Sequence, residues 1–365
     1  MEDVKDIEQK KGISPKLETV LFLSLFAVVF AALVAIASVY DLEISKILTK
    51  GNLHTGQYYS SSQFGLFFEA FGSTPIWLAI AVAGVIFFWN APRIKDSKIK
   101  LDEKGKKVLS VFVMIVCAVV VFAGLYFFVS EICKYVFEHM LNEEYKNNLY
   151  VMALEAFIAL PMAILLIFSW KNFNKDTHVK LMKFAFVLVC TAAFYLLITV
   201  IKTPIGRCRY RAMNYLDNFN YYTPWYVING KRNIIEFVDD SCKSFPSGHT
   251  FSAGVIYSIL SLPYLFKKLD KAWVKALFYV IAVGYTAMVA ISRIMVGAHF
   301  MSDVLFGGTI AFAASMLARE IFVCKFSHFT CFKKAKASDE AAEESVENVN
   351  AEKGSENATE QEKAD

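Results

Sequence analysis

The sequence has no metal-binding spacing among its seven cysteines and no internal repeat. The first absence excludes the common cysteine-based metal sites, and the second argues against the paired-repeat architecture of many transporters. Cys208 and Cys242 flank charged segments and can form a disulfide in an oxidising compartment; free thiols are the alternative, and the sequence leaves both open. Aromatic residues are missing after Phe332, where Glu, Ala, Ser and Asn dominate. We therefore expect a disordered tail at residues 334–365.

Long hydrophobic runs are abundant, since hydrophobic residues make up 56% of the 365 residues. That share is more than a soluble domain needs to fill its core. A helix needs about 20 apolar residues to cross about 30 Å of hydrocarbon, and open strand edges cannot be satisfied in lipid. We therefore predict an all-α, polytopic membrane helical bundle with about eight transmembrane helices. The expected spans are 19–40, 70–92, 108–130, about 148–170, 184–201, 250–266, 276–292 and about 299–318.

The distribution of Lys and Arg predicts the orientation. Alternate connections differ in basic content: seven Lys or Arg in 93–107 and four each in 171–183 and 267–275, against two each in 41–69 and 131–147. By the positive-inside rule both termini are cytoplasmic. We expect a cytoplasmic N-terminal segment at 1–18, a transmembrane domain at 19–333 and a cytoplasmic tail, in a bacterial plasma (inner) membrane. The first apolar stretch is too long for a cleaved signal peptide.

The connection 202–243 breaks this pattern, because it carries seven basic residues on the predicted outside. Four of them lie close together: Lys202, Arg207, Arg209 and Arg211. A guanidinium offers a rigid fork of donors that matches phosphate oxygens, and an ammonium adds a compact charge. The alternative is that these side chains reach the lipid headgroups and have no further role.

A second segment, Pro246-Ser247-Gly248-His249, opens the sixth expected span. Unpaired N–H groups at a helix start form an anion site, and Gly248 permits the close approach of a ligand. The alternative is an ordinary helix cap, with His249 as a surface residue.

A third segment, 292–303, contains Arg293, His299 and Asp303. The last two are four residues apart, so on a helix they share a face. A carboxylate bonded to one imidazole nitrogen leaves the other free to attack a substrate; a structural His–Asp pair is the alternative. Asp303 is the only carboxylate within the three segments, so we expect no metal. Counting spans places all three segments on the extracytoplasmic side.

Together these residues resemble the three-part signature of the type-2 phosphatidic acid phosphatase superfamily. The matching elements are Lys202 with Arg209 after six intervening residues, Pro246-Ser247-Gly248-His249, and Ser292-Arg293 with His299 and Asp303. The resemblance covers residues 202 to about 318 and departs at Tyr210, where the family usually has Pro. It implies a six-helix-type phosphatase core in the C-terminal part of the chain.

The resemblance also implies a role for each matching residue. His299 would be the nucleophile that forms a phosphohistidine, Asp303 would orient it, and His249 would be the general acid for the leaving alcohol. Phosphate binding would fall to Lys202, Arg209 and Arg293, helped by the Ser247 side chain and the Gly248 N–H. No metal or other cofactor is required in this scheme, because fixed cations and N–H groups stabilise the charge of a phosphoryl transition state.

The expected function is therefore that of a membrane phosphatase which removes a terminal phosphate from a lipid in the outer leaflet. Phosphatidate-like lipids, phosphatidylglycerophosphate, prenyl pyrophosphates and lipid A phosphates are the candidate substrates. A phosphotransferase with the same intermediate is a near variant. A transporter lined by the same charges and a catalytically silent lipid-binding protein are the alternatives from other classes. The expected partners are a phosphorylated lipid and membrane lipids but no nucleic acid, and the sequence does not fix the oligomeric state.

Overall fold

The computed structural model describes residues 15–137 and 148–325, with side chains from residue 24 onward. Residues Val29–Val323 form one compact unit, which contains every site discussed below. Most of the expected N-terminal segment 1–18 and the whole of the expected tail 334–365 lie outside the described residues.

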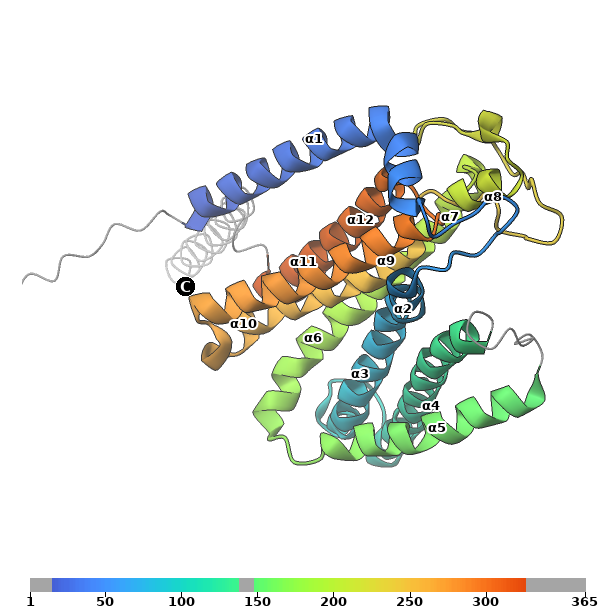
Figure 1. The fold of residues 1–365 in the computed structure, drawn as a ribbon. Helices are drawn as coiled ribbons and strands as arrows, with labels where there is room; N and C mark the ends of the chain where they lie inside the picture. Colours follow the sequence, from blue (N-terminus) through green and yellow to red (C-terminus); the bar gives the residue numbers. More distant parts are fainter. Residues whose placement is uncertain (1–14, 138–147, 326–365) are drawn as a thin grey trace, which may run out of the picture. The chain divides into compact units, whose positions relative to one another are not determined.

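Regular structure within the described residues is entirely helical (Figure 1). The α-helices are α1 Pro15–Thr49, α2 Gln63–Gly72, α3 Thr74–Asn90, α4 Glu103–Tyr135, α5 Leu149–Ser169, α6 Lys175–Ala193, α7 Tyr195–Ile205, α8 Tyr210–Tyr215, α9 Gly248–Gly254, α10 Leu262–Leu265, α11 Ala272–Met295 and α12 Met301–Arg319. The prediction of an all-α polytopic bundle is confirmed.

Seven helical stretches of the described chain are long and apolar enough to cross a membrane, where the sequence suggested about eight. They are Ser24–Thr49, Gln63–Asp96, Glu103–Tyr135, Leu149–Ser169, Lys175–Tyr215, Ala272–Met295 and Met301–Cys324. The expected span 250–266 accounts for the difference. It consists of α9, a 3-10 helix at Val255–Ser261 and the short α10. This continuous helical stretch is not among the seven, and it carries Thr250, Ser252, Ser258 and Ser261, which lower its mean hydropathy.

Small residues bring the helices into close contact. α3 packs against α4 and α6, while α9 packs against α11 and α12. A Cβ atom at Gly124 of α4 would lie 2.9 Å from the Trp77 carbonyl oxygen of α3. A Cβ at Gly307 of α12 would collide with the backbone of Ser247 at the start of α9. Close helix contacts through small residues are typical of membrane bundles, and here they fix the second expected segment beside the third.

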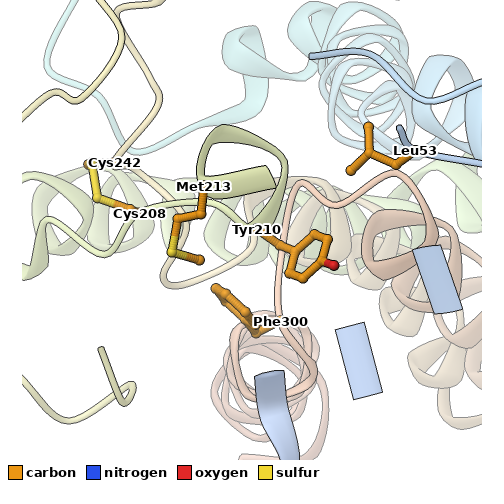
Figure 2. Close-up of a cluster of buried hydrophobic side chains, with 6 residues drawn as sticks. All are labelled: Leu53, Cys208, Tyr210, Met213, Cys242 and Phe300. Carbon is orange, nitrogen blue, oxygen red and sulfur yellow. A yellow bond between two sulfur atoms is a disulfide. The ribbon is translucent and has the colours of Figure 1, made fainter. Parts of the chain in front are cut away.

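A disulfide joins Cys208 to Cys242, which decides the alternative that the sequence left open. It belongs to a buried hydrophobic cluster with Leu53, Tyr210, Met213 and Phe300 (Figure 2). Tyr210, at the position where the resemblance led us to expect Pro, is the first residue of α8. Pro is common at a helix start because its fixed φ suits that position; here the buried aromatic ring packs into the cluster instead.

Candidate active site

The first basic segment leaves α7 and returns toward the loop before α9. α7 ends at Ile205 and is capped by Gly206, whose positive φ of 57° is a left-handed conformation that favours glycine. Lys202 donates from Nζ to the Lys243 carbonyl oxygen at 3.2 Å, and Arg209 forms an ion pair with Asp240. These contacts and the disulfide hold residues 240–244 beside the basic segment.

The second segment begins α9. The Ser247 hydroxyl accepts a hydrogen bond from the Thr250 N–H at 3.3 Å and contacts the Thr250 hydroxyl at 3.0 Å, so it caps the helix. The Ser247 N–H donates to the Asp303 backbone oxygen at 2.9 Å. A Cβ at Gly248 would lie 2.9 Å from the Tyr195 hydroxyl, so this position has little room for a side chain.

Asp303 lies in the first turn of α12, whereas His299 lies just before that helix, so the expected shared helix face is wrong although the two side chains are close. The His299 Nδ1 lies 3.7 Å from Asp303 Oδ2, which is longer than a hydrogen bond. Other donors take the carboxylate: the Phe300 N–H at 2.9 Å, the Ser244 hydroxyl at 2.5 Å and Arg207 Nη1 at 2.6 Å. Asp303 thus faces the imidazole as the sequence predicted, but its direct bonds go to these three groups.

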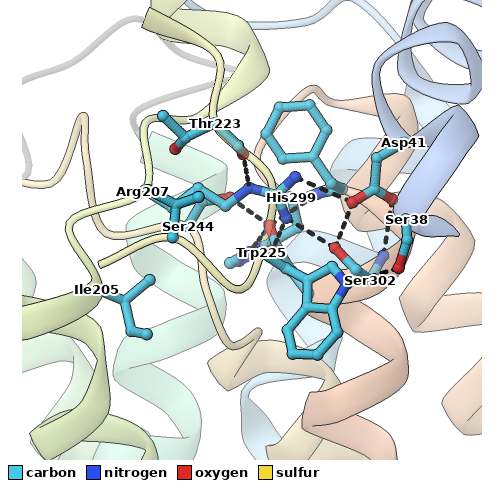
Figure 3. A network of polar contacts seen from close by, with 12 residues as sticks. Ser38, Asp41, Ile205, Arg207, Thr223, Trp225, Ser244, His299 and Ser302 are labelled. Atoms are coloured by element: carbon cyan, nitrogen blue, oxygen red, sulfur yellow. Dashed lines mark hydrogen bonds and ion pairs between the residues drawn. The ribbon is translucent and has the colours of Figure 1, made fainter. Parts of the chain in front are cut away.

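Arg207 is the centre of a buried network that the sequence did not predict (Figure 3). Its side chain has no exposed surface and lies between two carboxylates, Asp303 and Asp41 of α1, with Nη2 at 2.9 Å from Asp41 Oδ2. Its Nε donates to the Thr223 carbonyl oxygen at 2.9 Å. Asp41 in turn accepts from the Ser302 N–H at 2.9 Å. One buried guanidinium is therefore shared by two carboxylates, and the hydrogen bonds that Ser302 and Ser244 donate help to stabilise the remaining negative charge.

Two further residues from the N-terminal half reach the site. Glu69 of α2 has its Oε1 2.7 Å from Arg293 Nη1 and 3.7 Å from Arg211 Nη1. The Tyr135 hydroxyl, at the end of α4, lies 2.9 Å from His249 Nε2. The sequence offered one signal for Glu69, namely a carboxylate directly before an apolar run, but offered no such signal for Tyr135.

Charged residues of all three segments affect the pKa values of the two histidines. Burial lowers the pKa of His299 to about 3, and the charges of Lys202, Arg209 and Arg293 add to this effect while Asp303 opposes it. Burial also lowers the pKa of His249 well below its ordinary value, with the same three cations and His299 contributing. Both imidazoles are therefore neutral at neutral pH without a ligand, and both lie in the field of one cluster of cations.

A cavity of about 1050 Å³ opens next to this cluster. Part of its wall is polar and includes Arg209, Arg211, Arg293, His249 and Tyr135. Another part is apolar and comes from α3, α4, α6 and α7, including Trp77, Ile80, Val120, Val189 and Leu196. Lys202 and His299 do not line the cavity. A wall of this kind suits a molecule with an anionic group and a hydrocarbon portion.

Within the described residues, no group of three or more His, Cys, Asp or Glu side chains is placed to hold a metal ion. The expectation of a metal-free reaction stays a prediction.

Comparisons with known proteins show which family the C-terminal part of the chain is similar to. Residues 181–325 match the model of the PAP2 superfamily. Phosphatidylglycerophosphatase B of Bacillus subtilis (strain 168) is 34% identical over 88 residues, which is 22% of this chain and 40% of that relative. The chain thus matches less than half of that relative's length, and no solved structure matches. Residues 181–325 are similar to the PAP2 superfamily, as the three segments predicted, and the chain is an integral membrane protein.

Proposed function

We propose that the protein is a membrane lipid phosphatase that hydrolyses a terminal phosphate monoester or pyrophosphate of a lipid through a phosphohistidine. The observation that carries this proposal is the placement of two imidazoles in the field of Lys202, Arg209 and Arg293. The adjoining cavity, with its polar and apolar walls, and the family of residues 181–325 support it.

In the first step, Nε2 of His299 attacks phosphorus and the bond from phosphorus to the leaving oxygen breaks. His299 is the better nucleophile for being neutral, and the Asp303 carboxylate at 3.7 Å stabilises the positive charge that its ring acquires. The three cations, helped by the Gly248 N–H and the Ser247 hydroxyl, stabilise the negative charge on the phosphoryl oxygens.

His249 protonates the leaving oxygen in that step, which requires the imidazolium form. In the free protein, burial and the neighbouring cations oppose protonation. A bound phosphate offsets those cations, so substrate binding raises the pKa of His249 toward the range that a general acid needs. In the second step a water molecule gives a proton to His249 and attacks phosphorus, the bond to His299 breaks, and inorganic phosphate leaves.

The substrate class follows from the cavity and from the similar protein. An acyl or prenyl chain fits the apolar wall while the phosphate reaches the arginines. Because the similar Bacillus protein is a phosphatidylglycerophosphatase, a phosphatidylglycerophosphate is the first substrate to test. We place the site on the extracytoplasmic face of a bacterial plasma membrane, with residues 19–333 as the transmembrane domain and both termini in the cytoplasm, because of the distribution of Lys and Arg.

The test measures inorganic phosphate released from a lipid phosphomonoester by the purified full-length protein in detergent with EDTA present. We expect release by the wild type and none by His299→Ala. His54→Ala, a substitution of an exposed histidine, is the matched control and should retain the wild-type rate. Release that needs an added divalent cation would contradict the metal-free scheme, and release by His299→Ala would contradict the nucleophile. Added glycerol or sugar acceptors that become phosphorylated would identify the phosphotransferase variant instead.

A further inference from the structure

The end of α4 reaches the site from outside the family region. α4 spans Glu103–Tyr135, whereas the match to the family begins at residue 181. Its last residue places a hydroxyl 2.9 Å from His249 Nε2, and the two rings meet edge to face with centroids 6.1 Å apart. Both side chains line the cavity. The signature of the family therefore does not account for a direct contact to the residue that we assign as the general acid.

In the protonated form of His249, this contact decides which ring nitrogen can transfer its proton. A phenol oxygen accepts a hydrogen bond as well as it donates one, and an imidazole bonded through one nitrogen has the other left for proton transfer. When Nε2–H donates to the Tyr135 oxygen, Nδ1 is the nitrogen that carries the transferable proton. The Nε2–H bond then persists while Nδ1 gives its proton to the leaving oxygen and later takes one from water. The ring keeps its orientation through both steps.

We propose that Tyr135 is a positioning residue for the general acid and thereby places the leaving-group side of the site on α4. This inference rests on the proposed function, because it assumes that His249 protonates a leaving oxygen. Its consequence is specific to the leaving group. An alkoxide leaves only with a proton, so the hydrolysis of an alkyl phosphate depends on the acid, whereas p-nitrophenolate leaves without one.

The experiment compares Tyr135→Phe with the wild type on a lipid alkyl phosphate and on p-nitrophenyl phosphate. Because general acid catalysis contributes about 10²- to 10⁴-fold, we expect kcat/KM for the alkyl phosphate to fall by about 10- to 100-fold. We expect kcat/KM for p-nitrophenyl phosphate to change less than about twofold. This quantity covers only the steps up to the phosphohistidine, so it leaves out the later attack of water, in which His249 also takes part. His249→Ala should show the same selectivity with a larger loss. Tyr150→Phe, at a tyrosine of α5 that is 87% exposed, is the matched control and should leave both rates unchanged.

The p-nitrophenyl phosphate rate also reports that Tyr135→Phe is folded. An equal loss on both substrates would show a structural role and overturn the proposal, as would unchanged rates on both. A Tyr135→Phe protein that does not fold is also a contrary result, because a positioning hydroxyl is removable without loss of the fold. Failure of the proposed function looks different, since His299→Ala would then match the wild type or no phosphate would be released from either substrate.

Discussion

The two histidines of the site differ in how completely the protein itself surrounds them. Around His299, the neighbouring Asp303 is buried and bonded to Arg207, Ser244 and the Phe300 N–H. Around His249, contacts come from the end of α4, and a cavity adjoins the ring. We call the surroundings of His299 the nucleophile side and the surroundings of His249 the acid side. The difference suggests that folding alone fixes the contacts of the nucleophile side, whereas a bound substrate supplies the remaining contacts of the acid side. Preorganised charge is most effective where it need not rearrange during the reaction.

The largest effect that tests this comparison is expected at Arg207. Arg207→Met leaves two buried carboxylates, Asp41 and Asp303, without their shared cation. Removing one partner of a buried ion pair costs about 3–5 kcal/mol, so we expect a large loss of folded protein in a thermal unfolding assay in detergent. Lys46→Met, which removes an exposed pair with Glu43, is the control and should cost under about 1 kcal/mol.

A double variant sharpens this prediction. Asp41→Asn in the Arg207→Met background removes one of the two unpaired charges and should recover part of the lost stability. If Arg207→Met unfolds at the wild-type temperature, the network does not hold the nucleophile side together, and the contrast between the two histidines fails.

The second effect is a pH dependence of stability that comes from His299. Its pKa is lowered to about 3 in the folded protein, whereas an unfolded chain has a value near 6.5. Between about pH 6.5 and 3 the unfolded state therefore binds a proton that the folded state does not, so this residue makes the folded state less stable as the pH falls. Above about pH 6.5 the effect vanishes.

Comparing the unfolding temperatures of wild type and His299→Gln from pH 8 to pH 4 isolates this effect, because Gln does not titrate. We expect the wild type to lose more stability toward low pH than the variant does. Parallel curves would mean that the folded protein binds the proton as readily as the unfolded chain, which would contradict a buried neutral nucleophile.

The sequence predicted the parts of the site whose chemistry is local. Ser247 and Gly248 predict a helix start, and the structure has it. The spacing of His299 and Asp303 predicts that the two are close, which they are, but not through a shared helix face, because His299 precedes α12. The segment 250–266 is helical but is not among the seven spanning stretches, because Thr250, Ser252, Ser258 and Ser261 lower its mean hydropathy, which a search for uncharged runs does not weigh. The transmembrane helices were predictable because hydrocarbon thickness sets a minimum length.

The contacts that the sequence missed join residues far apart in the chain. Arg207 pairs with Asp41 across 166 positions, and Tyr135 contacts His249 across 114. No periodicity links such residues, since their proximity depends on helix packing. One signal was present: Asp41 directly follows the first apolar run and Glu69 directly precedes the second, and a carboxylate at the edge of hydrocarbon needs a partner. The positions of Asp41 and Glu69 in the sequence did not, however, show which residue each one pairs with.

The smallest effect is expected at Glu69, which tests whether the acid side awaits its substrate. The carboxylate lies 2.7 Å from Arg293 Nη1, where a substrate phosphate would compete with it for the guanidinium. Glu69→Gln keeps the shape of the side chain and its oxygen acceptor but removes the charge, so inorganic phosphate should inhibit the variant at about three- to tenfold lower concentration than the wild type, an effect in the range of a single partly screened charge pair. Glu43→Gln, at an exposed carboxylate, should not alter inhibition. Weaker inhibition of Glu69→Gln would mean that the carboxylate holds Arg293 in its binding position, and the acid side would then be as fully set by folding as the nucleophile side.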